Sequence, residues 1–96
     1  MGGLLQVPTG GLAVIQKVTP NYPQIAMQAR VQGIVLLKVM IGPDGRVQNI
    51  TTISGPAMLR QAAIDAVSQW VYAPVVVDGT AVPVMTDVEV NFALAP

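Results

Sequence analysis

The chain has 96 residues, enough for one small domain and too few for two. Hydrophobic residues make up 52% of it and charged residues only 10%, with a net charge of zero. A disordered tail or a nucleic-acid-binding segment needs far more charge, so we expect neither, and no nucleic-acid partner. The absence of cysteine and histidine excludes disulfides and thiol catalysis and removes the commonest general base and metal ligand.

The few charges are unevenly distributed along the chain. Residues 1–60 contain five basic residues and one acid, a net charge of +4, and residues 61–96 contain four acids and no basic residue. Scattered, solvated charges explain this pattern most simply, and a basic partner for the acidic end is the alternative. No apolar run approaches the ~18 residues of a transmembrane helix, so any membrane anchor is expected outside this sequence.

The opening residues alternate short apolar stretches with Gly and Pro, which indicates an extended lead-in with one short strand at Leu12–Val18. A short helix is predicted next, over residues 23–31. Pro23 suits the first helical position, where no backbone N–H is needed. Gly33 suits the left-handed position that follows a helix.

A β-hairpin is predicted after this helix. Residues 34–41 are almost continuously apolar, typical of a strand covered on both faces, one of them by a partner if necessary. Gly42-Pro43-Asp44-Gly45 predicts a tight turn, with Pro fixing φ at the second position and Gly supplying a positive φ at the fourth. The returning strand, residues 46–53, alternates imperfectly, and a bulge near Gln48–Ile50 would bring its apolar side chains onto one face.

A second helix opens at Ser54-Gly55-Pro56 and contains the clearest periodic pattern of the chain. Its apolar residues recur at helical spacing, which predicts a face packed on a sheet: Leu59, Ala62, Ala63, Ala66, Val67 and Trp70. After Pro74, the Asp78-Gly79 pair predicts a small hairpin. A last strand, about residues 84–94, alternates with period two, so one face lies on the core and one in water.

These elements predict an α+β fold, with two helices packed on one face of a three-stranded antiparallel sheet, in the order (short β)-α-β-β-α-β. Residues 1–19 are expected to form the extended lead-in and residues 20–96 the domain. The last strand either joins the hairpin or forms an edge.

Catalysis is not expected. The chain has no phosphate-binding loop, no dinucleotide fingerprint and no nucleophile elbow. Asp87 and Glu89 lie about 7 Å apart on one strand face, but a solubilising outer face explains them better than paired catalytic carboxylates. We therefore predict a protein that is not an enzyme and needs no cofactor and no metal. An exposed sheet edge can instead bind an extended peptide, unless the lead-in covers it.

Six short motifs follow one another between residues 11 and 94. They are Pro20-Asn21-Tyr22-Pro23, Arg30-Val31-Gln32-Gly33, Gly42-Pro43-Asp44-Gly45-Arg46-Val47, Ile53-Ser54-Gly55, Gln69-Trp70-Val71-Tyr72-Ala73-Pro74 and Val88-Glu89-Val90-Asn91-Phe92. In this order they resemble the C-terminal domain of the TonB energy transducer family. The resemblance implies a periplasmic domain tethered to the inner membrane by a segment outside this sequence, in a protein that works with the ExbB–ExbD motor.

The same resemblance implies that the domain couples to receptors. It would bind the TonB box, a short extended segment of TonB-dependent outer-membrane transporters, by β-strand addition and so drive nutrient import. Isolated domains of the family also form strand-exchanged dimers, which implies a possible homodimer. Carried over by position, the receptor-peptide-binding residues are Thr19, Pro20, Asn21, Tyr22, Met85, Thr86, Asp87, Val88, Glu89, Val90, Asn91 and Phe92.

Two departures from the family pattern affect receptor preference. Trp70-Val71-Tyr72 lacks the arginine of the more usual Trp-Arg-Tyr, and Thr19 stands where some relatives have Gln. A TolA-like or self-associating structural domain of the cell envelope, with the same shape, is the alternative function.

Overall fold

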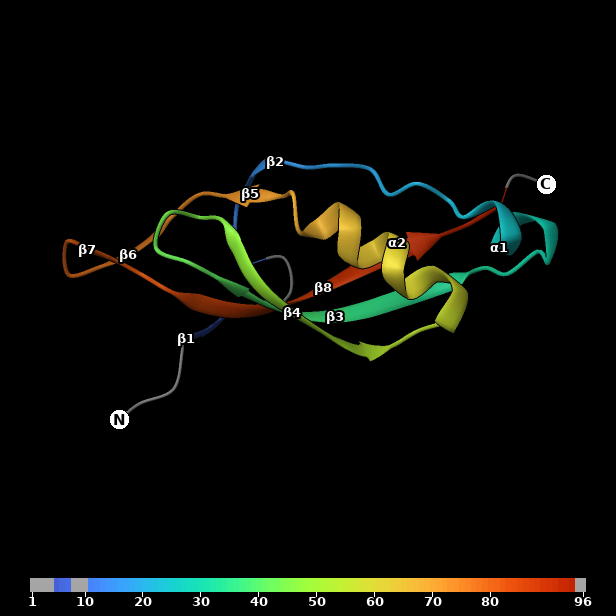
Figure 1. Cartoon of the computed structure of the whole chain (residues 1–96). Helices are drawn as coiled ribbons and strands as arrows, with labels where there is room; N and C mark the ends of the chain where they lie inside the picture. The colour runs from blue at the N-terminus through green and yellow to red at the C-terminus, as the bar shows by residue number, and fades with distance from the viewer. Residues whose placement is uncertain (1–4, 8–10, 95–96) are drawn as a thin grey trace.

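The computed structural model describes residues 5–7 and 11–94 and confirms the α+β class. Two helices, α1 and α2, interrupt the succession of strands in the described residues, and the long strands β3 and β8 run through the middle of the molecule (Figure 1). In chain order the elements are β1 (Leu5–Val7), β2 (Val14–Gln16), α1 (Gln24–Gln28), β3 (Gly33–Ile41), β4 (Val47–Ser54), α2 (Ala57–Val67), β5 (Val71–Tyr72), β6 (Val75–Val77), β7 (Thr80–Val82) and β8 (Val84–Phe92).

The main sheet has four strands within the described ranges, in the order β1-β8-β3-β4. β3 pairs antiparallel with β4 on one side and with β8 on the other, as predicted for three strands. The lead-in adds β1, which pairs parallel with the start of β8, so the prediction of a purely antiparallel three-stranded sheet was wrong. Three residues are too few to show a strand pattern in sequence, and this pairing depends on a distant part of the chain.

Two further strand pairs lie outside the main sheet. β2 pairs with β5, and β6 pairs with β7 as the predicted small hairpin. Asp78 and Gly79 have φ values of 51° and 79°, the two positive angles that a tight hairpin turn requires. β2 lies within the short strand predicted at Leu12–Val18, so β1 and β5 are the strands that the sequence did not predict. Both have only two or three residues, and their pairing depends on tertiary contacts.

The β3–β4 hairpin confirms the predicted turn and the predicted bulge. The Gly45 N–H donates to the Gly42 carbonyl at 2.9 Å, and Gly45 has a φ of +84°. The register shifts at Gln48, which brings the apolar residues on both sides of it against the core. A second shift leaves Ile53, at the far end of β4, 47% exposed.

Helix α1 is shorter than predicted. Arg30, with a φ of 55°, takes the left-handed position after it, and the Val31 N–H donates to the Ala26 carbonyl at 2.8 Å to close the last turn. The prediction that Gly33 ends the helix was wrong: Gly33 begins β3 with a φ of 148°.

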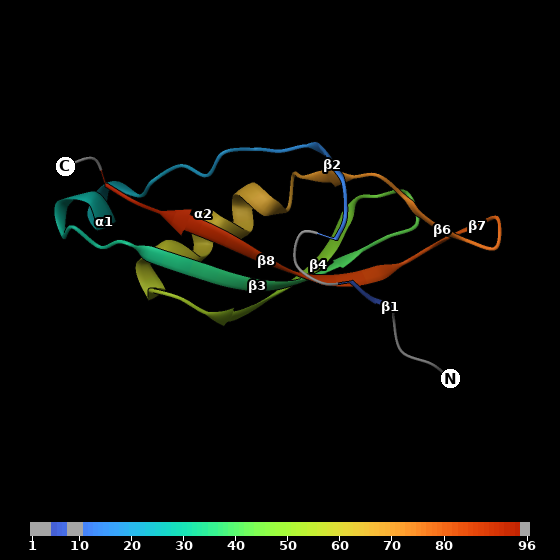
Figure 2. The ribbon, with the colours of Figure 1, turned by 180° about the vertical axis from the view of Figure 1, so that it is seen from behind.

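The core lies between α2 and the inner face of β3 and β8. Seen from behind, these two strands lie in front of α2 (Figure 2). The alternation predicted for β8 is confirmed, and β3 alternates in the same way, with Ile34 51% exposed at its start. The main members of the core are Val35, Leu37, Val39, Ile41, Leu59, Ala63, Val67, Trp70, Tyr72, Val84, Val88, Val90 and Phe92. No helix in the described part of the chain has the length and apolar character to span a bilayer.

Candidate strand-binding groove

The two sides of β8 are paired to different extents. β3 pairs with β8 along its full length, whereas β1 pairs only with Val84–Thr86. Within the described residues, no strand pairs with the other side of Asp87–Phe92. Six residues of open edge extend about 20 Å and present alternate N–H and C=O groups to a partner.

The extended segment 17–22, at the end of the lead-in and just before α1, lies opposite this open edge, and we call it the wall. The indole N–H of Trp70 donates to the Val18 carbonyl at 2.9 Å. The ammonium of Lys17 lies 5.1 Å from the centre of the same ring, a cation–π contact. Further along, the Tyr22 ring packs edge-to-face on Phe92 at 5.4 Å, and its hydroxyl donates to the Val31 carbonyl. These contacts fix one end of the wall to Trp70, which follows α2, and the other end to Phe92 of β8.

Two neighbouring pockets lie between the wall and β8. The Val88 pocket, about 270 Å³, is lined by Leu12, Val14, Lys17, Trp70, Tyr72, Thr86, Asp87, Val88 and Glu89. The Val90 pocket, about 310 Å³, is lined by Lys17, Val18, Thr19, Pro20, Trp70, Glu89, Val90 and Asn91. Because Lys17, Trp70 and Glu89 belong to both linings, the pockets adjoin, and together we call them the edge groove.

The structure brings eight of the twelve predicted binding residues to the edge groove. Thr86, Asp87, Val88, Glu89, Val90 and Asn91 line it from β8, and Thr19 and Pro20 line it from the wall. Tyr22 and Phe92 are placed against each other at its end. Met85 lies on the outer face beside Gln6 of β1, and the Thr86 hydroxyl donates to the Val7 carbonyl at 2.9 Å. The chain's own β1 thus already pairs with the backbone of Met85 and Thr86.

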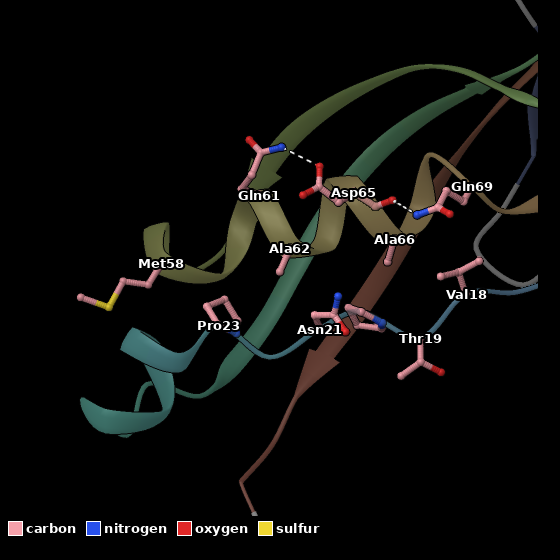
Figure 3. Close-up of a pocket in the computed structure, with 11 residues that line it drawn as sticks. Val18, Thr19, Asn21, Pro23, Met58, Gln61, Ala62, Asp65, Ala66 and Gln69 are labelled. Carbon is pink, nitrogen blue, oxygen red and sulfur yellow. Dashed lines mark hydrogen bonds between the residues drawn. The ribbon is translucent and has the colours of Figure 1, made fainter.

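Asn21, the remaining predicted residue, lines a third pocket on the other side of the wall. This helix pocket, about 380 Å³, lies against α2 (Figure 3). The Gln61 side-chain amide donates to the Asp65 carboxylate at 2.8 Å, and the Gln69 amide donates to the Asp65 carbonyl at 3.0 Å (Figure 3). Thr19 and Pro20 line both the helix pocket and the edge groove, so a single extended segment separates the two cavities.

Six residues of the edge groove were not predicted as binding residues from the sequence: Leu12, Val14, Lys17, Val18, Trp70 and Tyr72. Four of them lie in the lead-in, within the stretch where the sequence predicted a short strand but no binding residue. Trp70 was predicted to pack at the end of the helical stripe, and it does so at 6% exposure, but its contact with the wall was not predicted. Nothing in the sequence around Lys17 or Trp70 indicates that these two side chains are in contact.

Apolar and aromatic side chains line much of the groove, with Lys17, Asp87 and Glu89 as its charged residues. In the part of the chain that the structure describes, no three potential metal-ligating side chains gather. One titratable group stands out: burial raises the pKa of the Tyr72 phenol above its ordinary value of 10.0.

Stability is expected to fall at alkaline pH because of Tyr72. A raised pKa in the folded chain contributes stability that is fully present below pH 10.0 and is lost as the pH rises through the raised value. Urea unfolding at about pH 9 and about pH 11 measures the loss. The Tyr72→Phe variant, which has no phenol proton, should lose less stability over this interval, and an equal loss would contradict the assignment.

The family model described as "Gram-negative bacterial TonB protein C-terminal" matches residues 18–94. The chain belongs to this family. Protein TonB of Vibrio cholerae is 30% identical over 83 residues, which cover 84% of this chain and 34% of the relative. Protein TonB of Xanthomonas campestris is 38% identical over 77 residues, which cover 78% of this chain and 34% of the relative.

This TonB C-terminal family member spans about a third of the length of these relatives. The solution NMR structure of the Pseudomonas aeruginosa TonB C-terminal domain has the same fold, with a TM-score of 0.74. It is 22% identical in sequence, and the match covers 99% of this chain and 98% of that one.

Proposed function

We propose that this chain is the periplasmic receptor-coupling domain of a TonB-type energy transducer. It binds the TonB box of outer-membrane transporters by strand addition to β8 along Asp87–Phe92. The rest of the protein tethers it to the inner membrane and couples it to the ExbB–ExbD motor, so that binding drives nutrient import. The open stretch of β8, Asp87–Phe92, which faces the edge groove, is the observation that carries this proposal.

The first third of β8 supports strand addition. There β1 already forms a parallel pair with Val84–Thr86, so this side of β8 is able to accept a strand. A partner strand following the line of β1 would continue along the open residues. The backbone bonds of such a strand supply affinity without regard to sequence, as in other complexes formed by strand addition.

The energetics show that these backbone bonds are not sufficient. Six residues of added strand form about six hydrogen bonds, worth roughly 0.5–1.5 kcal/mol each. Ordering the same residues of a free peptide costs roughly 1–2 kcal/mol each. Because the two terms nearly cancel, side-chain contacts in the edge groove must supply most of the net affinity.

Strand addition predicts a distinct pattern of amide protection. Half of the amides of Asp87–Phe92 face β3 and are bonded already, while the other half face the open edge. A synthetic TonB-box peptide should therefore slow hydrogen exchange at every second amide of this stretch. NMR hydrogen exchange of the labelled domain, with and without the peptide, measures this pattern.

Two controls accompany the measurement. Sedimentation analysis over a range of protein concentrations shows whether a second copy of the chain already occupies the edge, as in a strand-exchanged homodimer. Amides of β4, on the opposite edge of the sheet, should keep their exchange rates. Uniform protection of both edges, or no change along Asp87–Phe92 at saturating peptide, would exclude this mode of binding.

A further inference from the structure

We propose that the helix pocket binds an arginine side chain of a partner protein. Asp65 forms the ion pair, and the side-chain oxygens of Gln61 and Gln69 accept further N–H groups of the guanidinium. This inference goes beyond the proposed function, because the helix pocket and the edge groove lie on opposite sides of the wall.

The helix pocket is a cavity between α2 and the wall. Its volume of about 380 Å³ lies within the usual range of ligand pockets, about 300–1,000 Å³. Ala62 and Ala66 form its floor, four residues apart on α2, and their methyl groups point toward the wall (Figure 3). Because both side chains are small, they leave room for a third side chain between the helix and the wall.

The polar rim of the pocket presents hydrogen-bond acceptors. The Gln61 amide nitrogen donates to the Asp65 carboxylate, and the Gln69 amide nitrogen donates to the Asp65 carbonyl. A carboxylate and a carbonyl only accept, so both glutamines turn their nitrogens toward Asp65 and keep their side-chain oxygens for a ligand. Within the described residues, Oδ1 of Asp65 receives the Gln61 bond and Oδ2 receives none.

The chain does not neutralise the negative charge of Asp65. None of its five basic residues, all of them within the described ranges, lines the helix pocket. Lys17 lies over the Trp70 ring, 5.1 Å from its centre, and lines the edge groove on the other side of the wall. Arg60 of α2 donates to the Gly55 carbonyl at 2.8 Å. The charge of Asp65 is therefore available to a cation from outside.

The arrangement of acceptors favours guanidinium over ammonium. Guanidinium carries five N–H donors in one plane, so it bonds a carboxylate and neighbouring amide oxygens together. Ammonium is a compact charge with three donors and reaches fewer acceptors at once. The methylene stem of arginine packs on the apolar floor, against Ala62, Ala66 and Pro20.

The arginine belongs to a protein and is not a free amino acid. Gln61, Asp65 and Gln69 are exposed, and an exposed ion pair strengthens binding only a few-fold. Such a gain is too small to hold a free amino acid but is useful as one contact of a larger interface. Met58, 45% exposed at the end of the pocket, offers the same partner an apolar contact.

The uneven charge of the sequence agrees with a basic partner. Asp65 is the first of the four acids in residues 61–96, a stretch without any basic residue. Asn21, predicted to bind a partner, lines the helix pocket opposite this acid. The site therefore explains two features of the sequence that strand addition at β8 does not use.

Three peptides test this inference. The parent is acetyl-Ala-Arg-Ala-amide, and its two controls carry at the central position lysine or citrulline, which has the shape of arginine without the charge. The citrulline peptide should bind about three- to fivefold more weakly than the parent, and the difference should shrink in high salt. The lysine peptide should bind at least about twofold more weakly, because it forms fewer hydrogen bonds. NMR titration of the full 96-residue chain, followed at the amides of Ala62, Asp65 and Ala66, measures these affinities.

A charge variant locates the effect. Asp65→Asn keeps a side-chain oxygen that accepts from Gln61 but has no charge, so the arginine peptide should bind it no better than the citrulline peptide does. Asp78→Asn is the matched control, since it removes one charge from the turn of the β6–β7 hairpin, outside the pocket. Asparagine tolerates the φ of 51° found there, and this variant should leave all three affinities unchanged.

Selective binding of the arginine peptide that disappears in Asp65→Asn supports the inference. Equal binding of the arginine and citrulline peptides, or no amide shift on α2 at millimolar parent peptide, overturns it. An affinity that Asp65→Asn leaves unaltered also overturns it, because the cation then binds elsewhere. Equal binding of the lysine peptide overturns the assignment to guanidinium.

Two features of the design keep the result decisive. If Asp65→Asn does not fold, the three peptides on the unmodified chain still decide the question. The shifts expected here lie on α2, whereas strand addition is measured at Asp87–Phe92, so either proposal can fail while the other holds.

Discussion

The Gly45→Ala variant is expected to lose about 2–4 kcal/mol of unfolding free energy, equivalent to a fall of at least about 8 °C in Tm for a domain of this size. Gly45 closes the β3–β4 turn with a φ of +84°, which an L-residue adopts only with strain. An added Cβ would also lie 1.9 Å from the carbonyl oxygen of Tyr72, so the backbone itself must move. Thermal unfolding followed by circular dichroism measures the loss.

A hydrogen bond explains why this movement is costly. The Tyr72 N–H donates to the Gly45 carbonyl at 2.8 Å, and Arg46 forms a β-bridge with Val71. The turn is thereby attached to β5, which lies under the Val88 pocket. Displacing the turn should therefore weaken peptide binding as well as the fold.

Gly79→Ala is the matched control for this variant. Gly79 has a similar φ of +79°, but a Cβ there would meet no atom within 4 Å. This variant should show only the strain of a left-handed residue, about 1–2 kcal/mol. Equal losses from the two variants would show that the approach of Tyr72 to Gly45 is not a tight one.

Gly45 also illustrates which features of this fold can be predicted from the sequence. The Pro-Asp-Gly turn was predictable because its φ requirements are local, and so were the periodic stripe of α2 and the alternation of β8. The contact between Gly45 and Tyr72 was not predictable, since it joins residues far apart in the chain. The same reason applies to β1, whose pairing with β8 depends on the whole sheet.

Some residues of the candidate site were likewise predictable from the sequence, and others were not. Residues 86–91 of β8 and the Thr19–Pro20 part of the wall were located by resemblance, and the structure brings them to one groove. Lys17 and Val14 come from a lead-in with neither periodicity nor a motif, so only the folded arrangement assigns them a place. Short extended segments are held by contacts made elsewhere, and their own sequences do not encode them.

Replacing Trp70 is expected to have the largest effect on fold and binding together. Trp70→Ala removes a side chain that is 6% exposed and should lose about 3–5 kcal/mol, a large share of the roughly 5–15 kcal/mol that stabilises a domain. It also frees the Val18 carbonyl and removes the ring under Lys17, so the wall is no longer fixed beside β8. Urea unfolding measures the loss of stability.

The Trp70→Phe variant separates the two roles of this residue. Phenylalanine keeps much of the apolar volume but cannot donate to Val18, so we expect a loss of roughly 1–2 kcal/mol in stability and a folded domain. Because the wall shapes both pockets, peptide affinity should still fall several-fold, with amide shifts at Thr19 and Asn21 in the free protein. A stable Trp70→Phe domain that binds a synthetic TonB-box peptide with unchanged affinity would contradict this expectation. The open edge of β8 would then bind the peptide without its wall, through backbone hydrogen bonds alone.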